Sequence, residues 1–560
     1  MGKSNLLHAI RLVLDPALPD SMRQLRMEDF WDGLPKPLSK DDRIEISVEL
    51  TEFEGDPKQL TLLGDHLVSP DPMVARLTYV FGPLHSEGDD APTPSDYDWI
   101  IYGGGREASH VESEVRRRLP LEFLAALRDA EGDLGNWRRS PLRPLLDRAA
   151  TQIDRATLEG IAAAVTEVTK SVTDTNAIGE LSNSIKQRLH EIGGSSQTLE
   201  TSLGFSPTDP ERLLRTLRIF IDEGRRSIGE ASLGSANVLY LALKLLEIEH
   251  LVEEGNRHHT FLAIEEPEAH LHPYLQRLVY RDVLRRRDHQ EGEKENVEER
   301  RTILLTTHSP HIVSVSPLES LVSLRRVANY TEASSAADLA FDPLDRADIE
   351  RYLDVSRGEI LFARGVLLVE GDAEVYMVPT LARLMGKDLD QLGIVVCSIS
   401  GTHFAPYIRL LKGLNIPFAV LTDRDPTQDS DGGVLRVKKL LREIVSAKFL
   451  EKFPTEEDQF GLARKRGLFL NEHCLEVDLF KAGLHKKMCK VIEVLTTNGA
   501  AKTRAQQWAV SPESIDVVRF LKDITAIGKG RYAQRLAGTL TKDICPPYIK
   551  EAIEYVAKKC

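Results

Sequence analysis

The chain has 560 residues, of which 42% are hydrophobic and 28% are charged. This composition is that of an ordinary globular protein, and the length suggests about two to four domains. No apolar run approaches the roughly eighteen residues that a membrane span needs, and the first residues lack the apolar core of a secretory signal. The net charge of −14 does not exclude nucleic-acid binding, because a local basic surface decides that property.

The five cysteines are scattered along the chain without a Cys-x-x-Cys pair. Such spacing argues against a zinc site or a disulfide framework, and it fits the reducing conditions of the cytoplasm. We therefore expect a cytoplasmic protein.

The first residues, Gly2, Lys3, Ser4 and Asn5, precede a helical pattern that runs through Leu14. They match the second half of the P-loop, in which backbone amides cradle phosphates, the lysine reaches the β- and γ-phosphates and the hydroxyl binds magnesium. The first glycine of the motif and its strand are absent. Either the natural protein begins further upstream, which we favour, or ATP binding is impaired.

An apolar strand is predicted at Phe261–Ile264, and two acids, Glu265 and Glu266, follow it. The pattern is typical of a Walker B strand, with Glu265 in the place where Asp usually helps to hold magnesium. Glu266 is then the base that positions the attacking water.

Two further segments complete this set of motifs. A predicted strand at Thr302–Thr307 is followed by His308, which looks like the switch histidine of ABC-type ATPases, a contact of the γ-phosphate. Upstream, Ser232 and Gly234 open an apolar helix and resemble a degenerate ABC signature, which caps the nucleotide of a facing subunit. The order of the motifs predicts an ABC-type ATPase domain at residues 1–345.

The segments around the motifs are less specific. Ile44–Phe53 and Val74–Phe81 alternate apolar and polar residues, as half-buried antiparallel strands do. From residue 119 to about residue 230 we predict helices, with an apolar stripe at Leu121, Phe123, Leu124 and Leu127. This helical insertion resembles the arm or dimerisation segment of such ATPases, and extra core helices are the alternative.

The second half of the chain contains an apolar, β-branched run, Val366–Val369, that ends in Glu370 and Gly371. A buried parallel strand that delivers a carboxylate to its carboxyl edge has this pattern. A helical pattern begins directly afterwards, so that Glu374 lies in the first turn and can project toward the same point as Glu370.

About fifty residues later the design is repeated. Phe418–Leu421 is a second predicted strand, and Asp423 and Asp425 follow it two positions apart. Magnesium and manganese prefer oxygen ligands, and carboxylates at two strand ends can supply them. N-capping of the following helices is the alternative explanation for these acids.

At these residues the chain resembles a Toprim domain, a Rossmann-like metal-binding fold of topoisomerases, primases and certain nucleases. We expect it at residues 346–560, with a helical C-terminal extension. A further β-rich run at Leu392–Ile399 ends in Ser400-Gly401-Thr402. Its glycine either lets the backbone approach the metal site closely or simply closes a turn.

An ABC-type ATPase domain followed by a Toprim domain, an α/β architecture, resembles the OLD (overcoming lysogenization defect) family of nucleases. The resemblance implies DNA cleavage with two Mg²⁺ or Mn²⁺ ions and binding of ATP with Mg²⁺. It makes Glu370, Glu374, Asp423 and Asp425 the expected metal ligands. Glu476 is the expected further acidic ligand, ahead of Asp478, and Lys529 is the expected late basic residue. An ordinary surface ion pair is the alternative for Glu476 and Lys529.

DNA must be held by local basic groups, since phosphate neutralisation supplies most non-specific affinity. Arg116–Arg118, Arg285–Arg287 and Arg464–Arg466 are candidates, although each of them also fits a solvated face. Nothing resembles a base-reading motif, so we expect weak sequence preference.

The sequence therefore predicts an ATPase-coupled, metal-dependent DNA endonuclease or nickase, working as a homodimer in phage defence or DNA repair, with a helicase as a candidate partner. One alternative is a DNA-clamping repair ATPase whose Toprim domain binds DNA without cutting it. Primase or topoisomerase function is disfavoured, because the partner domains and a recognisable tyrosine nucleophile domain are missing.

Overall fold

The computed structural model describes residues 2–83, 93–105, 109–193, 203, 205, 209–284, 300–425, 431–541 and 545–560. The chain forms two compact units. The N-terminal unit comprises Ser4–His272 and Arg287–Thr306, and the C-terminal unit comprises Met1–Lys3, Pro273–Arg286 and Thr307–Cys560. The expected domain boundary between residues 345 and 346 stays a prediction. Among the described helices, none is both long enough and apolar enough to cross a lipid bilayer.

The N-terminal unit contains an antiparallel sheet in which β3 (Met73–Gly82) pairs with β1 (Ile44–Leu50), β2 (Leu67–Pro70) and β4 (Asp98–Gly103). The two strands predicted from alternation, β1 and β3, are confirmed. Helix α1 (Lys3–Leu14) buries its apolar face in the same core as this sheet.

A second sheet of this unit is parallel, in the order β5-β8-β9. It consists of β5 (Leu121–Leu124), β8 (Thr260–Glu265) and β9 (Arg301–Thr306). The prediction of a helical stripe from Leu121 to Leu127 is wrong, because Leu121–Leu124 pairs in register with β8. Leu121 and Leu124 are buried, while Leu127 is 84% exposed. The local pattern fits the period of a helix and that of a strand, and burial beside β8 selects the strand.

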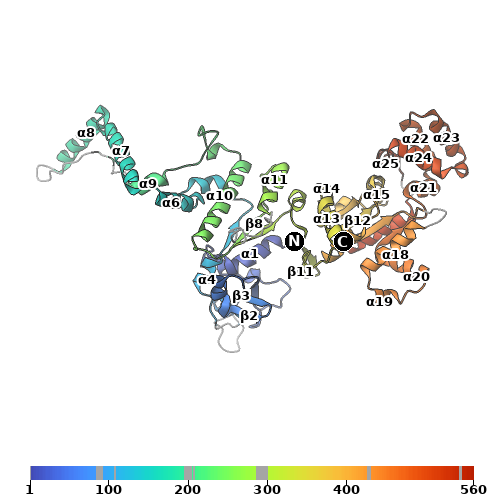
Figure 1. The fold of residues 1–560 in the computed structure, drawn as a ribbon, viewed down its shortest axis with the longest axis horizontal. Helices are drawn as coiled ribbons and strands as arrows, with labels where there is room; N and C mark the ends of the chain where they lie inside the picture. Colours follow the sequence, from blue (N-terminus) through green and yellow to red (C-terminus); the bar gives the residue numbers. More distant parts are fainter. Residues whose placement is uncertain are drawn as a thin grey trace. The chain divides into compact units, whose positions relative to one another are not determined.

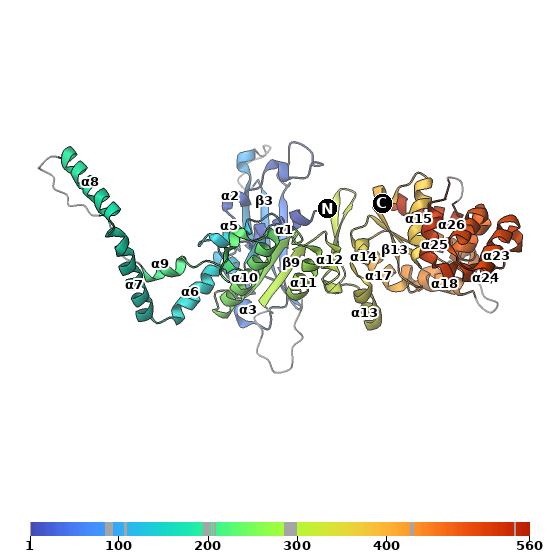
Figure 2. The same ribbon diagram turned by 90° about the horizontal axis from the view of Figure 1, so that it is seen from above.

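The segment that follows β5 is helical, in agreement with the predicted helical insertion. It contains α5 (Ala130–Gly135), α6 (Leu142–Gln152), α7 (Arg155–Thr173), α8 (Asn176–Gly193) and α9 (Pro210–Arg215). Helices α7 and α8 extend away from the sheets of this unit (Figures 1 and 2). A role of this arm in dimerisation stays a prediction.

The C-terminal unit is built on a parallel sheet in the order β13-β12-β14-β15. Its strands are β12 (Gly365–Val369), β13 (Ile394–Ser398), β14 (Phe418–Thr422) and β15 (Leu468–Leu470). All five residues of β12 are buried. Leu367 and Val369 face one core, which contains α15 (Asp372–Leu384) and α26 (Pro547–Lys559), while Val366 and Leu368 face a second core with α17 (Ala405–Gly413) and α18 (Gly432–Ile444). Helices therefore cover both faces, as in doubly wound folds.

Short helical elements precede β12 in this unit. They are α13 (Pro343–Tyr352), α14 (Val355–Gly358) and one 3₁₀ turn, where the sequence also fits one continuous helix from Asp348 to Phe362. The division follows from Asp354, whose carboxylate accepts a hydrogen bond from Arg357 N at 3.0 Å and so starts a new helix.

The sequence after β15 is helical. It includes α21 (Leu475–Leu479), α22 (His485–Leu495), α23 (Gly499–Val510), α24 (Val517–Ile527) and α25 (Lys529–Ala537). Helix α25 packs against α15, which brings the late basic residue Lys529 toward the sheet edge.

Candidate metal centre and nucleotide-binding residues

Two carboxylate-bearing strand ends lie side by side in the C-terminal unit. Glu370 follows β12 and Asp423 follows β14, and these strands are parallel neighbours. Parallel strands deliver their carboxyl ends to one edge of the sheet. Ligand atoms of Glu370, Asp423 and Asp425 all lie within 4.8 Å of one another. The arrangement of the three acids is that of a divalent-cation site.

The carboxylate of Glu370 is held by three donors. Its Oε1 accepts hydrogen bonds from Thr422 Oγ1 at 2.5 Å, Asp423 N at 2.8 Å and Arg436 Nη1 at 2.7 Å. The same guanidinium donates to the carbonyl of Asp423 at 3.0 Å. Arg436, on α18, therefore fixes both acidic strand ends, a role that the sequence did not predict.

Asp423 is buried beside an amide that the sequence did not single out either. Asn471 donates its Nδ2 to Asp423 Oδ1 and accepts the backbone N–H of Arg424 at 2.8 Å. Burial and the neighbouring carboxylates, with Glu374 first among them, raise the pKa of Asp423 well above its ordinary value. The carboxylate is thus oriented by the protein but lacks a nearby positive charge sufficient to stabilise it.

Glu374 lies in the first turn of α15 and is 9% exposed. Its Oε2 accepts the backbone N–H of Gly371 at 3.2 Å. Burial, followed by repulsion from Glu476 and Glu370, raises the pKa of Glu374 to about 7. The predicted convergence of Glu374 and Glu370 on one point agrees with this mutual repulsion.

The two acids of α21 differ in their surroundings. Glu476 and Asp478 are two positions apart, a spacing that would put both on one face of a strand. Leu475–Leu479 is helical instead, so the two side chains point in different directions. Glu476 is 4% exposed, and its Oε1 lies 3.4 Å from Lys529 Nζ. Asp478 instead accepts the backbone N–H groups of Glu472 and His473 at 3.1 and 3.4 Å, which is a structural role. Only Glu476 of this pair is brought to the acidic cluster.

The donor set fits a hard divalent ion. The second oxygen of Glu476, Oε2, is buried and has no hydrogen-bond partner among the described residues. An unpaired buried carboxylate oxygen is costly, and several acids that raise one another's pKa require a cation to be stable when ionised. Oxygen-only donors of this kind favour Mg²⁺ or Mn²⁺.

In the parallel sheet of the N-terminal unit, two acids lie at the end of β8. Glu265 is the last residue of β8, and Glu266 follows it in a left-handed conformation with φ of +40°. The backbone N–H of Glu266 donates to the carbonyl of Thr306 at 2.9 Å. The turn directs the chain away from the sheet at the point where a Walker B glutamate is expected.

The predicted signature segment also has a specific geometry. Ser232 caps α10 (Leu233–Glu253) by accepting the N–H of Ser235 at 3.2 Å. A Cβ atom on Gly234 would lie 2.7 Å from the carbonyl oxygen of His270. A glycine is required there because the loop after the Walker B strand touches the helix backbone.

The remaining predicted nucleotide contacts lie at the start of the chain and after β9. Gly2 has a φ of +87°, Lys3 begins α1, and Ser4 and Asn5 lie in its first turn. Lys3 Nζ donates to the carbonyl of Thr307 at 2.7 Å, next to His308. The lysine predicted to belong to a P-loop therefore contacts the residue that precedes the predicted switch histidine.

Two of the basic clusters are already engaged in structural contacts. Arg118 pairs with Glu114 and donates to the carbonyl of Gly255 at 2.6 Å. Arg464 lies 3.8 Å from Glu551, and Arg466 lies over the ring of Phe449. The cluster Arg285–Arg287 falls outside the described residues.

Two family models match the chain. The first, described as "AAA domain, putative AbiEii toxin, Type IV TA system", matches residues 1–314. The second, described as "Overcoming lysogenization defect protein-like, TOPRIM domain", matches residues 361–425, the segment that contains Glu370, Asp423 and Asp425.

Several known proteins are similar to this chain. The "OLD nuclease" of Thermus scotoductus is 27% identical over 447 residues, which cover 76% of each chain. "Endonuclease GajA" of Bacillus cereus is 23% identical over 313 residues, covering 51% of this chain and 45% of that protein. Among solved structures, the C-terminal region of the Burkholderia pseudomallei OLD protein is 42% identical, with a TM-score of 0.33, covering 35% of this chain and 98% of that one. The chain belongs to the OLD family, with an AAA-type ATPase domain followed by a Toprim domain.

Proposed function

We propose that this protein is a metal-dependent DNA endonuclease whose Toprim domain hydrolyses phosphodiester bonds and whose ATPase domain regulates that reaction. The observation that carries the proposal is the group formed by Glu370, Asp423 and Asp425, whose ligand atoms lie within 4.8 Å of one another at one sheet edge. The names of the similar proteins, a nuclease and an endonuclease, support the same reaction class and a DNA substrate.

Five carboxylates would hold two ions: Glu370, Glu374, Asp423, Asp425 and Glu476. When bound, two divalent ions would supply activation of the attacking water and stabilisation of the leaving oxygen. Arg436 orients Glu370 through a hydrogen bond of 2.7 Å, and Asn471 orients Asp423. These two residues keep the carboxylates in place whether or not the site is loaded.

Lys529 is the candidate for stabilising charge on the phosphate. Its ammonium group lies 3.4 Å from Glu476, and its side chain is 51% exposed. Burial alone would lower the pKa of Lys529. The nearby Glu476, Cys474 and Asp423 together outweigh burial, so that the net shift of this pKa is upward. The group is therefore positively charged at neutral pH and can neutralise a phosphate oxygen.

The ATPase domain would bind ATP with Mg²⁺ through Gly2, Lys3, Ser4 and Asn5. Glu265 would help to hold magnesium, Glu266 would position the attacking water, and His308 would contact the γ-phosphate. Ser232 and Gly234 would cap the nucleotide of a facing subunit, which requires a homodimer. Action in phage defence or DNA repair, with a helicase as a partner, is part of the same proposal.

Plasmid cleavage tests the proposed reaction. The full chain is incubated with supercoiled plasmid in Mg²⁺, Mn²⁺ or EDTA, with and without ATP. We expect nicked or linear product with either metal and none with EDTA. Retained DNA binding without cleavage in any metal would contradict the nuclease and favour a DNA-clamping ATPase.

A further inference from the structure

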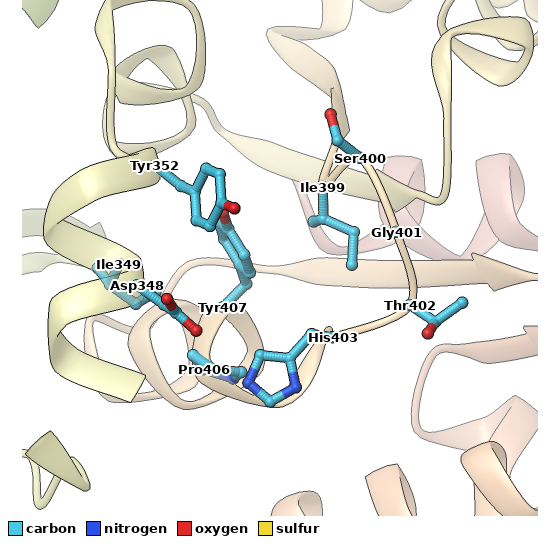
Figure 3. Close-up of a pocket in the computed structure, with 10 residues that line it drawn as sticks. All are labelled: Asp348, Ile349, Tyr352, Ile399, Ser400, Gly401, Thr402, His403, Pro406 and Tyr407. Atoms are coloured by element: carbon cyan, nitrogen blue, oxygen red, sulfur yellow. The ribbon is translucent and has the colours of Figure 1, made fainter. Parts of the chain in front are cut away.

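A small cavity lies at the carboxyl edge of the Toprim sheet, beside the acidic cluster. Its volume is about 180 Å³, more than a single water occupies. Helix α13, the loop after β13 and the start of α17 form its walls (Figure 3). Ten residues line it, and all of them are labelled in Figure 3.

The cavity is connected to the metal centre through backbone hydrogen bonds. Gly401 N donates to the carbonyl of Glu370 at 2.9 Å, and Ile399 N donates to the carbonyl of Val369 at 3.0 Å. The loop that forms one wall is thus bonded to the residue that bears a metal ligand. Since neighbouring strands lie about 5 Å apart, this wall of the cavity is one strand away from Glu370.

The interior of the cavity has an apolar floor with one unsatisfied donor. Ile349, Ile399 and Tyr407 are 1%, 7% and 5% exposed. The Tyr407 hydroxyl is buried without a hydrogen-bond partner in the part of the chain that the structure describes. Burial raises the pKa of Tyr407 to about 12, so the hydroxyl keeps its proton and needs an acceptor.

An aromatic wall stands next to this hydroxyl. The ring of Tyr352 lies alongside Tyr407 in Figure 3 and is 43% exposed. The Cζ atom of Arg357 lies 5.3 Å from the centre of this ring. The same guanidinium donates to Ser400 Oγ and to the carbonyl of Ser398, both at 2.9 Å. One guanidinium therefore fixes the aromatic wall and the opposite loop together.

The lining residues do not favour an anion, because the neighbouring guanidinium of Arg357 already pairs with Asp354 and donates to Ser398 and Ser400. No lysine or arginine is among the ten lining residues. The one basic lining side chain, His403, has its Nε2 3.0 Å from Asp345, and Asp348 adds a carboxylate to the rim (Figure 3). A phosphate would be repelled here, whereas a flat neutral ring with polar edges can stack on Tyr352 and accept or donate hydrogen bonds.

We propose that this cavity binds one unstacked nucleobase of the DNA substrate, next to the phosphate held at the metal centre. The inference rests on the proposed nuclease function and deepens it. Extrusion of a base costs a few kcal/mol and is least costly where the base is already unpaired. The protein should therefore prefer gapped, mismatched or single-stranded segments over continuous duplex.

Fluorescence of 2-aminopurine tests this cavity without relying on cleavage. The base is walked one position at a time through the gap of a gapped duplex, and the full chain is added with Ca²⁺, a hard divalent cation that takes the same oxygen ligands. We expect quenching at one position, as stacking on Tyr352 would produce. Tyr352→Ala should remove that quenching, while Tyr330→Ala, which truncates an exposed tyrosine of β11 (Tyr330–Ser335), should leave it unchanged.

The matching cleavage experiment uses the same duplexes with an abasic residue walked through the gap, in Mn²⁺. Loss of the bound base should slow cleavage by about ten-fold at the same position, within the range that base–aromatic stacking supplies. Tyr352→Ala should be slow on every substrate and show no position dependence.

The outcomes separate the two proposals. Uniform fluorescence along the gap, or a quenched position that persists in Tyr352→Ala, would overturn the base-binding cavity even if cleavage occurs. Position-specific quenching without cleavage in any metal would keep the cavity and contradict the nuclease. If adenosine monophosphate added alone alters cleavage while both scans are uniform, the ligand is a free nucleotide, and the assignment to a DNA base is wrong.

Discussion

The two parallel sheets of this protein both end in carboxylates, yet they produce different kinds of site. In the C-terminal unit, β12 and β14 are direct neighbours and each is followed by acids, so that Glu370, Asp423 and Asp425 converge. In the parallel sheet of the N-terminal unit, acids lie at the end of β8, and the neighbouring strands end in Leu124 and Thr306. Among the described residues, a convergent group of potential metal ligands occurs at the first sheet edge and not at the second.

The difference shows what strand order contributes to chemistry. Adjacent acidic strand ends concentrate enough negative charge to hold cations by protein ligands, as the raised pKa values of Glu374 and Asp423 indicate. A single acidic strand end beside Leu124 and Thr306 would leave the remaining ligands of a magnesium ion to water and to substrate phosphates, as in nucleotide sites. The first site should therefore load metal without nucleotide, and the second should not.

The largest effect is expected for Asp423→Asn. The amide keeps the shape and the acceptor for Asn471 but loses the charge, and cleavage should fall at least about a hundred-fold, beyond the range typical of outer-shell changes. Plasmid cleavage in Mn²⁺ measures this, with ATP hydrolysis as the control that should not change.

The same variant tests the charge balance through stability. Because the folded-state pKa of Asp423 lies above its ordinary value, its ionised form destabilises the metal-free fold, and this cost appears as the pH rises through that pKa. Thermal unfolding in EDTA at neutral pH should thus show an unfolding temperature equal to or above that of the wild type. A clear decrease would contradict the assignment of mutual repulsion.

The complementary change is Glu266→Gln, in the nucleotide site. Loss of a general base should lower ATP hydrolysis by about 10²- to 10⁴-fold, while metal-dependent cleavage without ATP should stay at the wild-type rate. Phosphate release and plasmid cleavage, measured on one preparation, check both statements. A parallel loss of cleavage without ATP would show that the two sites are not chemically separate.

A smaller effect is expected for Arg436→Ala, which removes the donor that joins Glu370, Thr422 and the carbonyl of Asp423. Outer-shell partners of metal ligands typically contribute about 10- to 100-fold. Cleavage should recover partly at higher Mn²⁺ concentration, since a misplaced ligand weakens metal affinity. Arg436→Lys should be intermediate, because all three contacts come from Nη1 of a planar guanidinium, and a lysine ammonium keeps the charge without that fixed geometry. Equal behaviour of both variants at every metal concentration would exclude a positioning role.

The smallest effect concerns packing in the N-terminal unit. Gly234→Ala places a Cβ 2.7 Å from the carbonyl oxygen of His270, and overpacking of this kind costs about 1–3 kcal/mol. Denaturant unfolding measures the loss. Gly160→Ala is the matched control in α7, because its Cβ meets nothing within 4 Å and should stabilise the helix slightly.

The convergence of Glu370 and Asp423 at one sheet edge could be predicted from the sequence, because strand and carboxylate are adjacent in the chain. Val366–Val369 has the pattern of a buried strand, and the residues directly after a buried parallel strand lie at the sheet edge. Arg436 gave no such signal, since it lies on an ordinary amphipathic helix. Asn471 directly follows β15, but that strand has three residues, and an amide there does not by itself indicate a metal site. Their roles depend on how β14, α18 and β15 meet in space.

The error at Leu121–Leu124 has a related cause. This segment fits both a helical and an extended period, and only the neighbouring β8 decides between them. Glu476 is expected ahead of Asp478, but the sequence does not indicate the helix in which Glu476 lies beside Lys529 and Asp478 accepts backbone N–H groups. A local pattern of about five residues does not decide between helix and strand, because the elements that pack against the segment decide it.

Binding of Mn²⁺ to the nucleotide-free protein is the most direct test of the central claim. Calorimetric titration of the full chain should detect metal binding that Asp423→Asn weakens strongly and that Glu266→Gln leaves unchanged. Binding that is insensitive to Asp423→Asn, or that disappears in Glu266→Gln, would contradict a metal centre formed by the adjacent strand ends of the Toprim sheet.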